Sequence, residues 1–140
     1  MADVIYNSFK KKIMDGSIDL DTDTIKVALV TSTYTPDQDT HDFFDDVTNE
    51  VVGTGYTAGG ASLANKAVTA DNTDNEGVFD ADDVAWTTST ITARGAVIYK
   101  STGTASTSPL ICYLDFGSDK ISTAGTFTIS WNAEGILNLN

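Results

Sequence analysis

From residue 78 to the end, the sequence is a series of short apolar runs with only turn-forming residues between them. Glycine, serine, threonine and aspartate fill the gaps, and no gap is long enough for a crossover helix. The alternation is clearest where Phe127, Ile129 and Trp131 alternate with threonine and serine. Strands spaced this closely pair with antiparallel neighbours, so the sequence predicts a mainly β fold, an antiparallel β-sandwich or barrel.

The predicted strands of this region share short length and flanking turn residues: 78–79, 84–86, 90–99, 110–116, 125–131 and 135–139. An earlier strand is predicted over residues 24–31, and it is apolar on both faces, as expected for an interior strand. Near Gly95 the alternation shifts by one residue, which predicts a β-bulge.

Residues 3–14 carry the pattern of an amphipathic helix. Ile5, Phe9 and Ile13 repeat every four residues and form one apolar stripe. Asp3 is predicted to be the N-cap or an acid of the first turn, and Gly16 is the predicted terminator just beyond the last apolar residue.

The length of 140 residues is typical of one structural domain. Within it we predict an N-terminal helical arm, residues 1–18, and a β-sandwich body, residues 19–140. No apolar stretch approaches the roughly 20 residues needed to span a bilayer, and the N-terminus lacks a signal-peptide pattern. We therefore expect neither a membrane protein nor a classically secreted one.

The charge is strongly acidic, with 20 Asp plus Glu against 8 Lys plus Arg and a formal net charge of −12. Only Glu50, Glu76 and Glu134 are glutamates, so the excess is aspartate, a turn and cap residue. Direct nucleic-acid binding needs clustered Lys and Arg to neutralise phosphates, so we do not expect it. The acidic surface is typical of a well-solvated protein, and it is also compatible with a cationic partner.

One motif resembles a functional loop but fits a structural role better. Residues 53–60 are glycine-rich, but they lack the Gly-Lys-Ser/Thr ending and the strand-to-helix context of a phosphate loop. We interpret these glycines as permitting a bend or a close backbone approach. Residues 43–47 predict a short helical turn whose aromatic side chains pack onto the body.

We find no catalytic constellation in the sequence and predict that the protein is not an enzyme. Cys112 is the single cysteine, and its place among Leu110, Leu114 and Phe116 predicts a buried thiol on one strand face. It also excludes an intrachain disulfide and fits folding in a reducing cytoplasm. His41 is the single histidine, and we interpret it as a surface-loop residue.

Acidic residues at alternate positions raise the question of calcium. Asp19, Asp21 and Asp23 have the spacing of a hard-cation loop, and residues 71–76 and 80–83 also supply carboxylates. None of these segments has the glycine and glutamate positions of an EF-hand. We interpret them as solvated turns and predict no cofactor, with Ca²⁺ at Asp19, Asp21 and Asp23 as the alternative.

Aromatic residues allow a second alternative, a carbohydrate-binding module. Tyr34, Tyr56, Trp86 and Tyr99 would form a sugar-stacking platform if they were exposed together. Trp86, however, lies in an apolar-patterned strand, which favours the core.

Five segments resemble, in the same order, small structural proteins of tailed bacteriophages: residues 19–37, 51–60, 79–86, 93–99 and 125–131. The resemblance covers nearly the whole chain. It implies a virion component made in the host bacterial cytoplasm, either a capsid decoration or cement protein or a neck, tail or adaptor protein. It transfers no catalytic residue.

Such a role implies a homo-oligomer that contacts the major capsid protein or other virion proteins, because shell symmetry repeats each contact. The apolar stripe of the N-terminal helix is the natural docking element. Its candidate assembly contacts are Ile5, Tyr6, Phe9, Lys10 and Ile13. The alternative use of the helix is packing within its own chain. A host-adhesion module that binds carbohydrate is the competing function.

Overall fold

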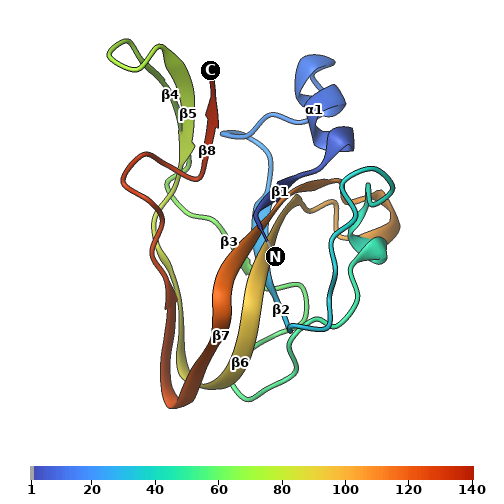
Figure 1. Ribbon diagram of the computed structural model, residues 1–140, viewed down its shortest axis with the longest axis vertical. Coiled ribbons are helices and arrows are strands. Elements are labelled where there is room, and N and C mark those ends of the chain that lie inside the picture. Colours follow the sequence, from blue (N-terminus) through green and yellow to red (C-terminus); the bar gives the residue numbers. More distant parts are fainter. Residues whose placement is uncertain (1) are drawn as a thin grey trace.

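The computed structural model describes residues 2–140 and shows a mainly β protein (Figure 1). Its strands are β1 (Val4–Ile5), β2 (Ile25–Val30), β3 (Ala61–Ser62), β4 (Ala67–Asp71), β5 (Glu76–Asp80), β6 (Val84–Lys100), β7 (Leu110–Ile129) and β8 (Leu137–Leu139). Its helical segments are α1 (Asn7–Met14) and two single 3₁₀ turns, η1 (Phe44–Asp46) and η2 (Ala105–Thr107).

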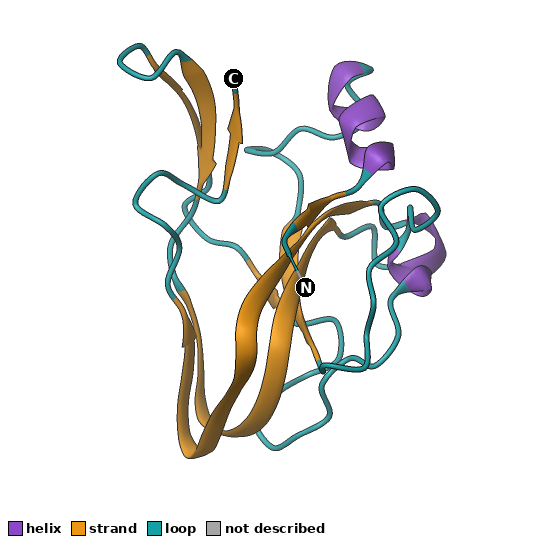
Figure 2. Cartoon of the chain, in the orientation of Figure 1, coloured by secondary structure: helices purple, strands orange, loops and turns teal. Residues whose placement is uncertain are grey.

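The strands form two antiparallel sheets, in the orders β1-β7-β6-β2-β3 and β4-β5-β8. Figure 2 shows that strands and loops make up most of the chain, with α1 set to one side. The predicted mainly antiparallel β fold is confirmed. The sheets do not close into a barrel.

The ribbon of β6 and β7 is the backbone of the fold, and it doubles back on itself (Figure 1, lower end). Register shifts flank Ser89, and Thr88 and Ala124 adopt positive φ angles of 49° and 46°. The buried Ser89 hydroxyl bonds the Ser122 hydroxyl at 2.8 Å and the Gly125 carbonyl at 3.0 Å, which fixes the corner. We call residues 125–129 the return limb of β7.

This corner corrects the predicted strand division. Residues 84–86 and 90–99 belong to one strand, β6, and residues 110–116 and 125–129 belong to one strand, β7. A β-bulge bends a strand sharply without ending its pairing. The alternation of apolar and polar residues is therefore interrupted at the corner, although β6 and β7 remain paired through it. The predicted bulge near Gly95 is confirmed by a register shift between Ala93 and Gly95.

Both faces of the large sheet are buried. Ile25, Val27 and Leu29 of β2 belong to the main core, which also contains Trp86 and Phe127 of the doubled-back ribbon. The opposite face of β2 contributes Ala28 and Val30 to a second core with four tyrosines: Tyr6, Tyr34, Tyr99 and Tyr113. The predicted interior strand is therefore confirmed.

The N-terminal segment differs from its prediction. A short strand, β1, pairs Val4 with Tyr113 and Ile5 with Cys112, and the helix begins only at Asn7. Asp3 is not an N-cap, because its Oδ1 accepts a hydrogen bond from the Asp115 amide at 2.7 Å. Residues 4 and 5 fit a helical period, but in the structure they form backbone hydrogen bonds with the edge of β7 as a short antiparallel strand.

The end of the helix is as predicted, since α1 stops at Met14 and Gly16 adopts a φ of 79°. The domain division at residue 18 stays a prediction, and Met1 lies outside the described residues.

The predicted face of Cys112 is partly wrong. Cys112, Leu114 and Phe116 do contact the main core, but Leu110 lies in the second core. Ile98 pairs with Cys112 and Tyr99 pairs with Leu110, so Ile111 of β7 is an extra residue with no counterpart on β6. This one-residue insertion turns the side chain of Leu110 to the opposite face of the sheet from Cys112.

The glycine-rich segment is confirmed as a close backbone approach. Gly60 has a φ of 76°, and a Cβ at this position would overlap the Val27 carbonyl. A Cβ on Gly53 would overlap the Thr90 carbonyl in the same way. The predicted turn at residues 43–47 is also confirmed, as η1, and Phe44 stacks on Tyr99 with ring centroids 4.1 Å apart.

Candidate interaction surface and acidic loops

The five predicted assembly contacts divide by burial. Tyr6 is 0% exposed and Phe9 is 7% exposed, so both aromatic side chains lie in the core of their own chain. Ile5 and Ile13 are half-buried against the main core, and Lys10 is exposed. The two aromatic residues therefore stabilise the chain itself, and Lys10 is the one exposed residue among the five. Its role in assembly stays a prediction.

A loop over residues 34–41 holds the N-terminal segment in place. The Asn7 amide donates to the Gln38 carbonyl at 3.1 Å, and the Gln38 side chain donates back to the Ile5 carbonyl at 2.8 Å. The Asn7 side chain also donates to Asp39 at 2.8 Å. These reciprocal bonds supply partners for backbone groups at the strand-to-helix junction.

Beneath that loop lies a buried chain of polar side chains. The Tyr6 and Tyr34 hydroxyls are 2.8 Å apart, and the Tyr34 hydroxyl lies 3.0 Å from His41 Nδ1. Burial raises the pKa of both tyrosines, to about 12 for Tyr34. His41 Nδ1 also accepts from the Asp37 amide at 3.2 Å. The predicted loop position of His41 is correct, but the ring is half-buried and structural.

The outer face of α1 is cationic and partly apolar. Met14 is 82% exposed, and Lys10 and Lys11 are exposed beside it. Lys12 instead lies over the Phe43 ring, with Nζ 4.8 Å from its centroid, a cation–π contact. The helix thus presents a basic surface on an acidic protein.

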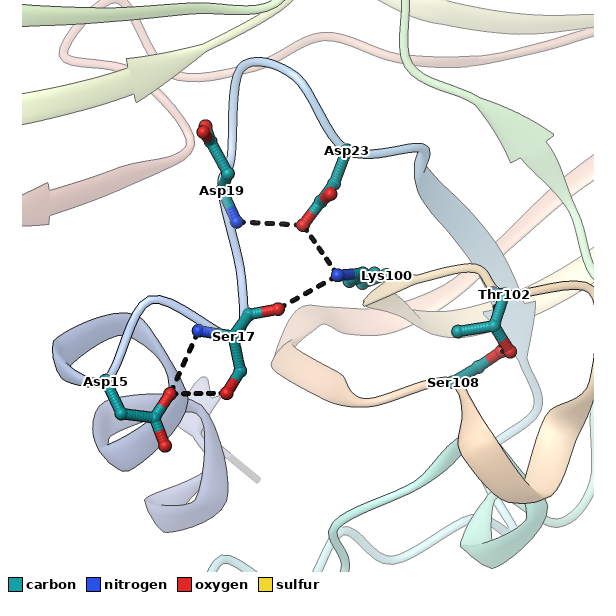
Figure 3. A network of polar contacts seen from close by, with 7 residues as sticks. All are labelled: Asp15, Ser17, Asp19, Asp23, Lys100, Thr102 and Ser108. Atoms are coloured by element: carbon teal, nitrogen blue, oxygen red, sulfur yellow. Dashed lines mark hydrogen bonds and ion pairs between the residues drawn. The ribbon is translucent and has the colours of Figure 1, made fainter.

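The loop with Asp19, Asp21 and Asp23 is organised around a lysine (Figure 3). Lys100 Nζ lies 2.9 Å from Asp23 Oδ2 and donates to the Ser17 carbonyl at 2.9 Å. Asp23 also accepts from the Asp19 amide at 2.8 Å. The Asp21 carboxyl group donates its proton to the Asp19 carboxylate, which raises the pKa of Asp21 and lowers that of Asp19. Lys100 therefore already neutralises one carboxylate of the candidate calcium loop. Calcium at this loop stays a prediction.

A second acidic group lies at the turn between β4 and β5. Carboxylate oxygens of Asp71, Asp74 and Glu76 lie within 4.8 Å of one another, close enough to share a metal ion. Asp71 Oδ1 accepts from the Thr73 amide at 2.8 Å and from the Asp74 amide at 3.2 Å, which is the bonding of an ordinary turn. The turn bonding therefore accounts for the position of the Asp71 carboxylate in this cluster.

The thiol of Cys112 is buried as predicted, and burial raises its pKa to about 12. A thiol with this pKa is not ionised at neutral pH, so it is a poor nucleophile.

The aromatic residues of the possible sugar platform are engaged inside the protein. Tyr34, Trp86 and Tyr99 are buried. The half-buried Tyr56 donates to Glu50 at 2.6 Å and accepts from the Leu29 amide at 2.9 Å. These four rings do not form an exposed stacking surface.

Sequence reasoning missed an open groove of about 380 Å³ beside the return limb of β7. Phe116, Lys120 and Ile121 line one side, and residues 126–130 line the other. Ile121 is 68% exposed, although it lies within a strand. The signal in the sequence was the uncharged run after Lys120, but only the corner at Ala124 brings its two ends together.

Comparison of the chain with protein families, curated proteins and solved structures finds no match. None of the helices within residues 2–140 is long and apolar enough to cross a membrane.

Proposed function

We propose that this chain is a non-enzymatic structural protein of a bacteriophage virion, a capsid decoration or cement protein that stabilises the head. The proposal rests on the resemblance of five segments, in the same order, to small structural proteins of tailed phages. The proposal includes a sandwich-like body, in which the returning end of the β6–β7 ribbon packs over the rest of the large sheet, and a homo-oligomeric assembly on the particle.

The environment of the reactive side chains is consistent with a structural role. Cys112 is buried with a raised pKa, and His41 is committed to Tyr34 and Asp37. The only ion pairs within residues 2–140, Arg94–Asp115 and Lys100–Asp23, join parts of the chain far apart in sequence. These groups contribute to holding the fold together.

The partner surface in this proposal includes the outer face of α1. Lys10 and Lys11 give it positive charge, and the exposed Met14 gives it apolar area. Such a face suits an acidic groove on a capsid protein. The rest of the chain is acidic and would face solvent, where its charge keeps assembled particles apart.

The deciding experiment is the copy number of the chain per purified virion, measured by quantitative mass spectrometry against the major capsid protein. We expect near-stoichiometric amounts, because a decoration protein repeats across the icosahedral shell. A count of roughly three to twelve would identify a ring at the neck or tail instead. Absence from the particle would overturn the virion proposal, and a glycan array would then test the adhesion module.

A further inference from the structure

The outer edge of β7 pairs with another strand over only a short stretch in the part of the chain that the structure describes. On one side β7 pairs with β6 along its length, and on the other it pairs with β1 only at Cys112 and Tyr113. Further along, the Asp115 amide donates to Asp3 Oδ1, and the return limb has no partner strand on this side within residues 2–140. An unpaired edge presents backbone donors and acceptors that another strand can bond.

The return limb also lacks the features that normally protect such an edge. Proteins that stay monomeric place charges, prolines or very short strands at sheet edges. Residues 121–131 contain no charged residue and no proline, and they are rich in threonine, isoleucine and aromatic residues. Thr126, Thr128 and Ser130 are exposed, whereas Phe127 and Ile129 are buried.

The sequence of the limb is symmetric about its middle residue. Read outward from Thr128, each direction gives an apolar residue, Phe127 or Ile129, and then a hydroxyl residue, Thr126 or Ser130. Antiparallel pairing of two such limbs therefore places Thr126 opposite Ser130 and Phe127 opposite Ile129. Hydroxyl pairs and aromatic–β-branched pairs are both favourable across strands.

The charge distribution favours a second copy at this edge. A chain with a net charge of −12 repels its own copies over most of its surface. No acidic residue occurs between Asp119 and Glu134, and the charged residue that lines the adjacent groove is the cation Lys120. The Asp83 carboxylate accepts from the Trp131 amide at 3.0 Å, just beyond the limb, so two copies can meet along residues 125–129 without an acidic residue of that segment opposing another.

We propose that two copies of this chain pair antiparallel along the return limbs of their β7 strands, about a twofold axis at Thr128. The interface is isologous, so each copy contributes the same residues. An added strand on this edge also covers the groove and reduces the exposure of Ile121 to water. The pairing gives the proposed homo-oligomer its contact surface, but its test does not depend on the virion role.

The test uses charge pairs at Thr128 in the full-length protein. Thr128 is exposed, so Thr128→Glu and Thr128→Lys should both fold, as near-ultraviolet circular dichroism will show. On a twofold axis each variant faces its own charge, and we expect the dimer Kd from sedimentation velocity to rise about tenfold or more. An equimolar mixture of the two variants pairs opposite charges and should restore association to near the wild-type Kd.

The matched controls are Thr69→Glu and Thr69→Lys, at an exposed threonine of the edge strand β4 in the other sheet. These variants should leave the Kd unchanged. A wild-type protein that is monomeric at all concentrations would overturn the proposal, as would Thr128 variants that dimerise normally or a mixture that fails to restore association. A high virion copy number with a monomeric protein would leave the proposed function standing and reject only this interface.

Discussion

Replacing Tyr34 by phenylalanine should destabilise the protein, because it leaves the buried hydroxyl of Tyr6 without its hydrogen-bond partner. Tyr34 connects Tyr6, at 2.8 Å, with His41 Nδ1, at 3.0 Å. The substitution removes one oxygen and changes little of the ring packing. It leaves the Tyr6 hydroxyl, which is fully buried, without its hydrogen-bond partner.

The expected magnitude follows from that burial. A buried polar group without a partner costs about 1–3 kcal/mol, so Tyr34→Phe should lower the free energy of unfolding by that amount. Tyr6→Phe leaves Tyr34 bonded to His41 and should cost about 0.5–1.5 kcal/mol. In the double variant neither hydroxyl remains to be satisfied, so its cost should fall below the sum of the two single costs.

Urea unfolding measured by tryptophan fluorescence tests this double-mutant cycle. The chain has two tryptophans: Trp86 lies in the main core and Trp131 packs against it. Tyr6 and Tyr34 belong to the second core, so the fluorescence reports unfolding without being perturbed locally. A coupling of about 0.5 kcal/mol or more is expected for residues in direct contact. Strictly additive costs, or a Tyr34→Phe cost below about 0.5 kcal/mol, would refute the role of the buried chain.

Three further predictions concern other parts of the fold. Gly60→Ala should lower the free energy of unfolding by about 3 kcal/mol or more, or prevent folding, because its Cβ would overlap the Val27 carbonyl at a position with positive φ. Gly103→Ala is the control in the same urea assay: its φ is also positive but its surroundings are open, so it should cost only about 1–2 kcal/mol. The Gly117 amide and Arg94 lower the pKa of Asp115 to about 2, so its stabilisation is complete above the unfolded pKa and is lost as pH falls through 2. Asp115→Asn should therefore lower the urea midpoint at pH 7 by the equivalent of about 1–2 kcal/mol, and a deficit that persists at pH 2 would contradict this. Cys112 should react with a thiol reagent only after unfolding, and rapid native-state labelling would show that the region opens.

Local patterns predicted much of the fold because their causes are local. The alternation in residues 24–31 and 125–131 reflects strands with a fixed inner and outer face. The first is β2, and the second is the end of the longer strand β7, which stops at Ile129. Gly16 ends the helix because left-handed backbone favours glycine in any context. The close approach at residues 53–60 was likewise readable, because glycine is the residue that leaves room for another backbone.

The burial of the candidate assembly contacts was harder to predict, because it depends on which other segments of the chain pack against them. Tyr6 and Phe9 have the spacing of a docking helix, and nothing in that spacing distinguishes a neighbour's groove from the chain's own core. The loop at residues 34–41 decides the matter, since it covers Tyr6 with Tyr34 and caps the junction with Gln38. That covering arises from contacts about 30 residues apart in sequence.

The sequence by itself determined the class of the fold, its acidic surface and the burial of Cys112, since alternation, charge and apolar neighbours are properties of short segments. The tertiary structure alone decided that β6 and β7 are continuous, that Leu110 and Cys112 lie in different cores, and that the return limb leaves an open edge. Bulges cause the first two, because one inserted residue reverses a face or turns a corner at a small local cost, and the strand order of the sheet causes the third. The positions of the bulges depend on which strands pair and in which register, and this pairing joins residues far apart in the sequence.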